Sequence, residues 1–166
     1  MTKKKGTTPL PDDHHVCRYV PNQRQHRDFD TGQLIGVLTT AFDLRPQDKG
    51  GLSVTWVEFF GPKTTATLKQ AADAYRKCTR SKKLTPSAAF AVGNVLAIKK
   101  ASAVAGKPAR VLHEQTKCNA AHAAIRRLDN DQIEVLDAIA QQAFGEIADR
   151  DGSIVCLSPA MGISPS

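Results

Sequence analysis

Hydrophobic and polar residues alternate along several short segments of this chain, and a period of two predicts β-strands. The clearest such segment is 52–60, where Leu52, Val54 and Trp56 share one face. Glu58 falls on that same face, where a carboxylate must be paired or near solvent, and we expect it to emerge at the strand's end. Further strands are expected at 14–20, 34–44, 90–98, 110–114 and 153–157, while 119–128 is open between a helical turn and a strand.

Two segments instead repeat apolar residues every three or four positions, which predicts amphipathic helices. The first begins at a cap on Thr64 or Thr65 and runs to about residue 81. The second follows Asp131, which forms a capping-box pattern with Glu134, and runs to about residue 148. The order of elements predicts an α+β fold, with an antiparallel or mixed sheet of about five to six strands and two main helices packed on it.

The length of 166 residues fits a single domain. We expect residues 1–13 to form a flexible basic N-terminal tail, 14–157 the domain, and 158–166 a loose C-terminal tail. The N-terminal lysines are not followed by the apolar run of a signal peptide, and no stretch is as apolar as a membrane helix. The sequence therefore predicts a cytosolic protein without a membrane partner.

The cysteines are far apart and none forms a Cys-x-x-Cys pair. In a reducing cytosol we expect free thiols, the alternative being a secreted protein with two disulfides. The pairs His14–Cys17 and Cys118–His122 have the spacing of zinc ligands, but His14 and Cys17 point to opposite faces of a strand. We predict neither a metal site nor a cofactor. The cysteines are Cys17, Cys78, Cys118 and Cys156.

A formal net charge of +7 favours anionic partners. The basic residues gather in the N-terminal tail and along one stretch near the first helix, where we predict a surface that contacts phosphate. The alternative is an ordinary solvated surface. Aromatic residues that could stack on bases are missing near the lysines of this stretch, which disfavours single-stranded nucleic acid. The predicted binding residues are Arg76, Lys77, Arg80, Lys82 and Lys83.

The histidines are the candidates for catalysis, because histidine transfers protons near neutral pH. If the first strand lay beside strand 110–114, its histidines would face those of the later segment. Arg18 would then hold an anionic group, and Glu58 or Glu114 would orient an imidazole. This arrangement predicts acid–base catalysis on a phosphate or ester. The alternative is that these are surface or structural histidines. The candidate catalytic residues are His14, His15, Arg18, His113 and His122.

Four motifs stand out between residues 14 and 128. They are His15-Val16-x-Arg18-Tyr19, Ala41-Phe42-x-Leu44-Arg45, Leu52-Ser53-Val54-x-Trp56-x-Glu58, and Val111-x-His113 followed by Asn119-x-Ala121-His122-Ala123-x-Ile125. Together they resemble a group of small uncharacterised bacterial cytosolic proteins. The resemblance implies no activity and no catalytic residues.

Two functions are therefore expected. Phosphate-binding loops, dinucleotide fingerprints, nucleophile elbows and zinc-protease motifs are all missing from the sequence. The first expectation is a non-catalytic binding or accessory domain that binds nucleic acid, a nucleotide or another protein through a basic surface. The second is a His-dependent enzyme acting on a phosphorylated or nucleotide substrate. Three of the histidines meeting Arg18 in one cleft would favour the enzyme.

Overall fold

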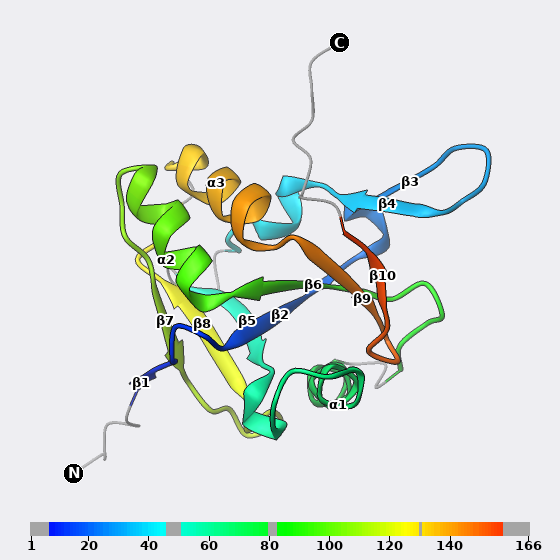
Figure 1. The fold of residues 1–166 in the computed structure, drawn as a ribbon, viewed down its shortest axis with the longest axis horizontal. Helices are drawn as coiled ribbons and strands as arrows, with labels where there is room; N and C mark the ends of the chain where they lie inside the picture. Colours follow the sequence, from blue (N-terminus) through cyan, green and yellow to red (C-terminus); the bar gives the residue numbers. More distant parts are fainter. Residues whose placement is uncertain (1–6, 46–50, 80–82, 130, 158–166) are drawn as a thin grey trace.

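A large antiparallel sheet forms the centre of the molecule (Figure 1). The computed structural model describes residues 7–45, 51–79, 83–129 and 131–157. Within them the sheet has eight strands, in the order β1-β7-β8-β5-β2-β6-β9-β10. Their bounds are β1 (Thr8–Pro9), β2 (His15–Val20), β5 (Leu52–Trp56), β6 (Ala89–Asn94), β7 (Arg110–His113), β8 (His122–Arg126), β9 (Glu146–Asp149) and β10 (Ile154–Cys156).

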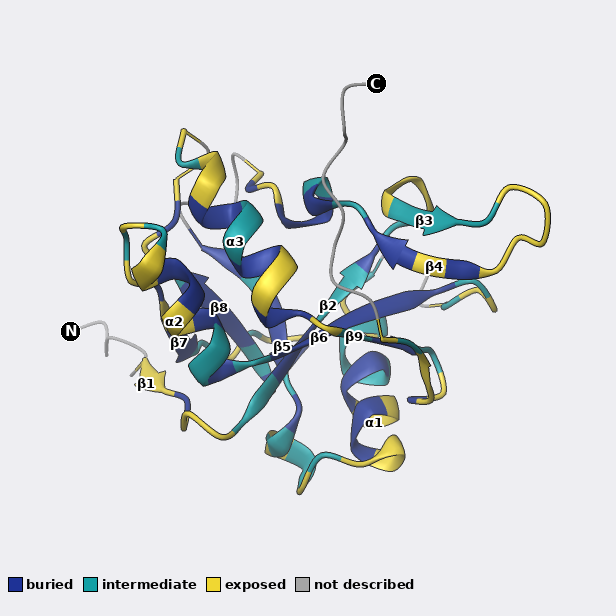
Figure 2. Cartoon of the chain, turned by 45° about the horizontal axis from the view of Figure 1, so that its top comes forward, coloured by how far each residue is buried: buried dark blue, intermediate teal, exposed yellow. Residues whose placement is uncertain are grey.

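Three α-helices in the described part of the chain cover the sheet unequally. α2 (Val95–Val104) and α3 (Ile133–Ala143) pack together on one face, and α1 (Thr65–Arg76) lies on the other (Figure 1). The buried sides of all three helices face the sheet (Figure 2). The larger core lies under α2 and α3, where Phe42 and Phe144 pack with ring centroids 4.8 Å apart. The smaller core lies under α1 and leaves part of that face uncovered.

The start of α1 follows the sequence prediction. The Thr64 hydroxyl accepts a hydrogen bond from the Thr67 amide, and the Thr67 hydroxyl accepts one from the Thr64 amide. This reciprocal capping satisfies two amides that the first turn would otherwise leave unpaired. Leu68, Ala71 and Ala72 are buried against the sheet, as their helical spacing predicts.

The prediction of five to six strands and two helices is wrong. The α+β class and the largely antiparallel sheet are confirmed, but segment 90–98 is a strand only to Asn94. The Asn94 side chain accepts from the Ala97 amide and so starts α2 directly. The second predicted helix ends at Ala143, and its last residues belong to β9 instead. Its N-cap is Gln132 without a side-chain cap bond, so the capping box on Asp131 is also wrong.

Two other segments differ from the expectation. Residues 25–27 and 34–37 form a separate hairpin, β3 (Gln25–Arg27) with β4 (Leu34–Val37), which projects beside the sheet (Figure 1). The sheet also begins earlier than predicted, because Thr8 and Pro9 pair with β7 and Leu10 is buried. Residues 1–6 and 158–166 of the expected tails lie outside the described residues.

The expectation of four free thiols is wrong. A disulfide joins Cys78, just after α1, to Cys118 in the loop before β8, and leaves Cys17 and Cys156 as thiols. The two partners are 40 positions apart, so only the fold brings them together. Disulfides persist mainly in oxidising compartments, and the cytosolic location therefore stays a prediction.

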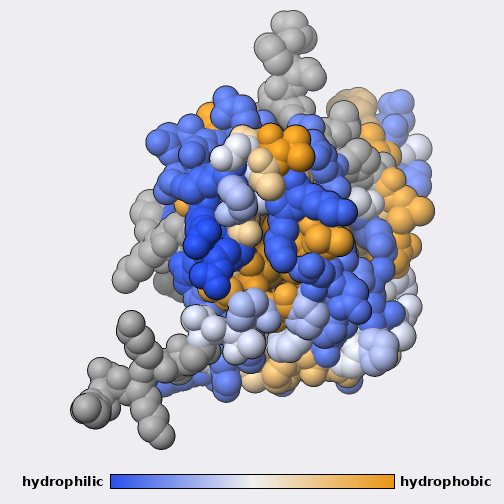
Figure 3. All heavy atoms as spheres, turned by 60° about the vertical axis from the view of Figure 1, so that its left-hand side comes forward, coloured by the Kyte–Doolittle hydropathy of each residue, from blue (hydrophilic) through white to orange (hydrophobic). Residues whose placement is uncertain are grey.

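Among the described residues, no helix is both long and apolar enough to span a bilayer. On the face drawn in Figure 3, hydrophilic residues cover most of the surface, and hydrophobic residues appear as separate patches between them.

Candidate functional site

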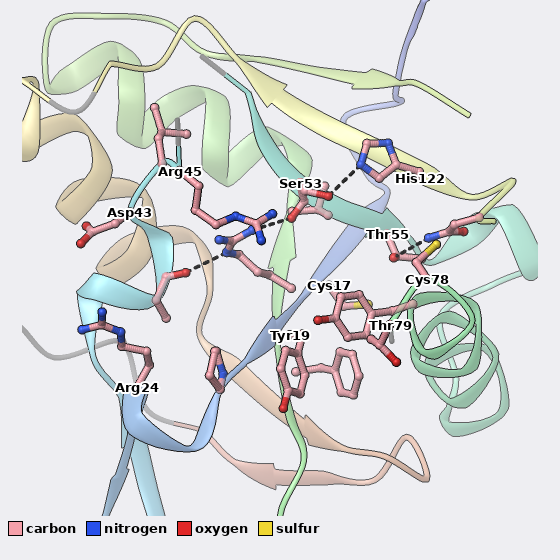
Figure 4. Close-up of a pocket in the computed structure, with 18 of the residues that line it drawn as sticks. Cys17, Tyr19, Arg24, Asp43, Arg45, Ser53, Thr55, Cys78, Thr79 and His122 are labelled. Atoms are coloured by element: carbon pink, nitrogen blue, oxygen red, sulfur yellow. Dashed lines mark hydrogen bonds between the residues drawn. The ribbon is translucent and has the colours of Figure 1, made fainter. Parts of the chain in front are cut away.

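A cavity of about 600 Å³ opens on the α1 side of the sheet (Figure 4). Its floor is made by side chains of β2, β5 and β8, and one wall by the residues that follow α1. The opposite wall is the segment from the 3-10 helix η2 (Thr39–Phe42) to Arg45. This volume is in the range of small-molecule sites.

Arg18 lies where two strands of the floor separate. β2 pairs with β5 only at Val16–Trp56 and Cys17–Thr55. Beyond that point the Arg18 Nη1 donates to the Ser53 carbonyl at 2.7 Å, and its Nε donates to the Ala41 carbonyl at 2.8 Å. Both acceptors are neutral, so these bonds orient the guanidinium without cancelling its charge. Arg18 thereby connects the floor of the cavity to the η2 wall and carries a positive charge to that floor.

The cavity lining is strongly basic. Arg24 and Arg45 join Arg18 in the lining, and Asp43 is the only carboxylate among the lining residues described. Arg24 Nη1 donates to the Thr40 hydroxyl at 3.0 Å on the wall formed by η2. Figure 4 shows Arg45 extending from the same wall toward Ser53. Three guanidinium groups against one carboxylate favour an anionic ligand.

Ser53 and His122 form a hydrogen-bonded pair in this cavity. Alternation along β5 turns Ser53 away from the core residues Leu52 and Val54, and its Oγ lies 2.7 Å from the His122 Nε2. The Nδ1 of His122 lies 2.7 Å from the carbonyl oxygen of Glu114, which can only accept a hydrogen bond. Nδ1 therefore carries the proton, and in the neutral ring Nε2 accepts the hydroxyl proton of Ser53.

The carbonyl that orients His122 is itself held in place. Arg126 Nε donates to Glu114 Oε2 at 2.7 Å, and Arg126 Nη2 pairs with Oε1. These bonds hold the pKa of the Glu114 carboxyl below its ordinary value of 4.5, although partial burial opposes them. The Glu114 amide also donates to the His122 carbonyl at 2.9 Å. Glu114 thus orients the imidazole through its backbone, while its carboxylate pairs with Arg126.

Thr55 and Asn119 complete the polar side of the floor. The Asn119 side chain is buried and donates to the Thr55 hydroxyl at 3.1 Å. Asn119 follows Cys118 directly, so the disulfide to Cys78 anchors the loop that carries it to the residues after α1. Cys78 and Thr79 line the cavity beside this link. The disulfide therefore links the loop of Asn119 covalently to the wall that follows α1.

An aromatic wall faces the basic residues. The rings of Tyr19 and Tyr75 stack with centroids 4.9 Å apart, and Phe90 meets Tyr75 edge-on. Burial, followed by the charge of Tyr19, raises the pKa of Tyr75, while Arg18 and Arg45 act in the opposite direction. Tyr19 also borders a second, smaller hollow of about 260 Å³. A ligand that carries both a planar group and negative charge would find partners on adjacent walls.

Cys17 lines the cavity but is a poor nucleophile. The residue is only 3% exposed. Burial, and secondarily the charge of Glu58, raises the pKa of the Cys17 thiol to about 12. A thiol with such a pKa stays protonated at neutral pH, and the thiolate is the reactive form. The Ser53 hydroxyl is therefore a better candidate nucleophile in this cavity than the Cys17 thiol.

The structure divides the histidines of the predicted catalytic set. β8 and β5 lie between β7 and β2, so the condition on which the predicted set depended is not met. Only His122 and Arg18 of that set line the cavity. His14 and His113 both pack on the Trp56 ring, with centroids 5.7 and 5.2 Å from it.

His15 forms a separate pair with Glu58. The His15 ring Nδ1 lies 2.5 Å from Glu58 Oε1, and the His15 amide donates to Oε2 at 2.7 Å. β5 ends at Trp56, so Glu58 leaves the strand as expected and starts a 3-10 turn. Burial raises the pKa of Glu58, but the bonds from His15 outweigh it, and the net pKa lies below 4.5. This pair ties the start of β2 to the end of β5.

The predicted binding surface does not coincide with the cavity. Arg76 pairs with Asp73 one turn earlier at 3.7 Å, and Lys77 and Lys83 are exposed. None of these three lines the cavity. Arg80 and Lys82 lie outside the described residues. Cys118, which has the spacing of a zinc ligand pair with His122, is part of the disulfide. The described residues contain no group of three or more side chains that could hold a metal ion.

Several residues of the site escaped the sequence analysis. Ser53 and Thr55 occupy the polar face of the clearest predicted strand, and that alternation is a signal that could have singled them out. Arg45 and Asn119 stood inside the motifs but carried no predicted role. Arg24 lies between the strands expected at 14–20 and 34–44 and carried no predicted role. The pairing of β5 with β8 at Thr55–His122 brings Ser53 to His122, and no sequence pattern predicts that register.

Comparisons of the chain with protein-family models, with curated proteins and with solved structures found no match. The function of the cavity therefore has to be inferred from its geometry.

Proposed function

We propose that the protein binds a small phosphorylated molecule with a planar group, such as a nucleotide, in the cavity on the α1 side of the sheet. The observation that carries this proposal is the convergence of Arg18, Arg24 and Arg45 on one cavity. Guanidinium groups match phosphate oxygens in geometry as well as charge.

The polar floor supports the same ligand class. Thr55 lies in the same lining and accepts a hydrogen bond from Asn119, so its hydroxyl proton remains available to a ligand. Phosphate oxygens accept several hydrogen bonds at once, so a mixture of charged and neutral donors suits them. Asp43 disfavours an anion placed directly beside it, which leaves the floor near Arg18 as the favoured position for the phosphate.

The aromatic wall supports a planar group on the ligand. Stacking on an aromatic side chain contributes roughly 1–3 kcal/mol per base and tolerates any base. The stacked rings of Tyr19 and Tyr75 both belong to the cavity lining. A nucleoside monophosphate would reach from this wall to Arg18 within a cavity of this volume.

Calorimetric titration at low salt tests the proposal with three probes: pyrophosphate, a nucleoside monophosphate and the corresponding nucleoside. Arg45→Gln is expected to raise the Kd for pyrophosphate about tenfold or more, because a charged hydrogen bond contributes about 1.5–3 kcal/mol. Tyr19→Leu is expected to weaken the monophosphate but not pyrophosphate.

Arg110→Gln is the matched control for the arginine variant. Arg110 is exposed on β7 and does not line the cavity, so its loss changes the net charge equally. The Kd of the Arg110→Gln variant for pyrophosphate is expected to change less than twofold. Equal losses in both arginine variants would attribute the binding to overall charge and would refute the proposal, as would a lack of binding to all three probes.

An oligonucleotide held by the basic residues near α1 is the competing interpretation. Lys77 and Lys83 are exposed and do not line the cavity. If an oligonucleotide binds tightly and loses affinity on Lys77→Gln but not on Arg45→Gln, the ligand site lies on that surface instead.

A further inference from the structure

We propose that the Ser53–His122 pair hydrolyses phosphate esters, with Ser53 as the nucleophile and His122 as its general base. The inference rests on the proposed binding of phosphorylated molecules in the same cavity. It goes further, because a binding site needs neither a nucleophile nor a base.

The hydrogen bond between the two residues has the direction that catalysis needs. The Glu114 carbonyl fixes the proton of His122 on Nδ1, so Nε2 is left to accept the Ser53 proton at 2.7 Å. A nucleophilic hydroxyl is weak unless an adjacent base removes its proton, and the base in turn needs a third group that orients it. Here the orienting group is a backbone carbonyl rather than a carboxylate.

The support around this carbonyl is rigid. The two hydrogen bonds from Arg126 hold the Glu114 side chain, and the pairing of the Glu114 amide with the His122 carbonyl closes the β7–β8 hairpin. Both residues of the pair lie on strands of the central sheet rather than on loops. Sites on such elements keep their geometry better than sites on loops.

Arg18 is placed to neutralise the charge of the reacting phosphoryl group. Its Nη1 bonds to the carbonyl of Ser53, so the guanidinium lies beside the nucleophile itself. Phosphoryl transfer spreads negative charge over three equatorial oxygens, and arginine side chains stabilise that charge. The contrast with Cys17 is informative, because that thiol, in the same floor, has a pKa of about 12 and offers no thiolate.

The reaction proceeds in two balanced steps. The Ser53 Oγ attacks phosphorus while His122 Nε2 takes its proton, and the bond from phosphorus to the alcohol oxygen breaks on the opposite side. The alcohol leaves with the electron pair and takes a proton from water. In the second step water attacks the phosphoseryl group and releases its proton to solvent. The Ser53 Oγ leaves and takes its proton back from His122, so the sum is ester plus water giving alcohol plus phosphate.

The test uses p-nitrophenyl phosphate with the full chain and Ser53→Ala, His122→Ala and Ser153→Ala variants. Ser153 is an exposed serine outside the cavity and serves as the matched control. Wild type and Ser153→Ala are expected to release p-nitrophenol, and acid quenching should trap one phosphoryl group on the peptide that contains Ser53. Ser53→Ala should lose both signals, and His122→Ala should lower the rate about a hundredfold or more.

Binding of pyrophosphate by each variant separates this inference from the proposed function. Ser53→Ala is expected to bind pyrophosphate within about threefold of wild type, because the arginines remain. If wild type binds pyrophosphate but neither releases p-nitrophenol nor carries phosphoserine between pH 5 and 9, the catalytic inference is refuted and the binding function stands. Activity that persists in Ser53→Ala, or phosphate on another residue, also refutes it. Failure to bind pyrophosphate refutes the proposed function itself.

Discussion

The guanidinium of Arg18 donates a 2.7 Å hydrogen bond to the backbone carbonyl of Ser53. This contact joins β2 to β5 where their pairing ends. It also places a positive charge next to Ser53, whose hydroxyl is hydrogen-bonded to His122. One side chain thus serves both the fold and the candidate site.

Arg18→Met is expected to lower the free energy of unfolding by about 2–4 kcal/mol, because two carbonyls lose a charged donor in a partly buried position. Arg24→Met provides the comparison, since its hydrogen bond to Thr40 is exposed and should contribute less than about 1 kcal/mol. Urea unfolding monitored by circular dichroism measures both values. Equal small losses in the two variants would mean that Arg18 does not hold β5 and the η2 segment together.

Removal of the disulfide is expected to destabilise the fold. Closing a loop of 40 residues by a covalent link contributes about 4 kcal/mol in the chain-entropy description. The double variant Cys78→Ser with Cys118→Ser should therefore unfold at lower denaturant concentration than the oxidised protein. Reductant should lower the midpoint of the wild type and leave the double variant unchanged. An effect of reductant on the double variant, or none on the wild type, would contradict this pairing.

Glu58→Gln should remove stability in a pH-dependent manner. The pKa of Glu58 lies below its ordinary 4.5 in the folded protein, so the contact of its carboxylate with His15 favours folding fully above pH 4.5. This contribution is lost as the pH falls through the folded-state pKa. The difference between wild type and Glu58→Gln, about 1–3 kcal/mol near neutrality, should shrink toward acidic pH.

Thermal unfolding of both proteins between pH 3 and 7 measures that difference. Asp151→Asn is the control, because Asp151 is exposed at a turn. A Glu58→Gln effect that stays constant down to pH 3, or that grows there, would show that the carboxylate charge is not what stabilises the contact.

The two thiols should differ in reactivity. Cys156 is only partly buried, whereas Cys17 is buried and has a pKa of about 12. Iodoacetamide at pH 8 is therefore expected to modify Cys156 in the folded protein and Cys17 only after unfolding. Peptide mass spectrometry identifies the modified residue. Rapid modification of Cys17 in the folded protein would show that its thiol is accessible and forms a thiolate. Cys17 would then be an alternative to Ser53 as the nucleophile.

The sequence patterns predicted the fold class and the central strands well, because their signals are local. The alternation in β2 and β5 and the stripe of α1 each follow from neighbouring residues in the chain. The change from β6 to α2 at Asn94 was missed, since Phe90 to Ile98 alternates well enough to pass for one strand. Apolar runs of this length do not distinguish a strand from a buried helix.

Only part of the candidate site could be predicted, because its contacts depend on how distant strands pair. Arg18 and His122 were chosen for their chemistry, but the partner of His122 is set by strand register, which brings Ser53 rather than another histidine to it. The predicted set of histidines depended on β2 lying beside β7, and β5 and β8 lie between these two strands. Contacts between Cys78 and Cys118 likewise depend on the position of α1 over the sheet, which spacing along the chain does not encode.

A nuclear magnetic resonance titration with pyrophosphate tests the binding cavity most directly. We predict that shifts of the backbone amide signals concentrate on the cavity residues, above all at Arg18, Ser53, Thr55 and His122, and saturate together with one Kd. Shifts that gather instead on the exposed lysines near the end of α1, or that never saturate, would contradict a ligand site on this face of the sheet.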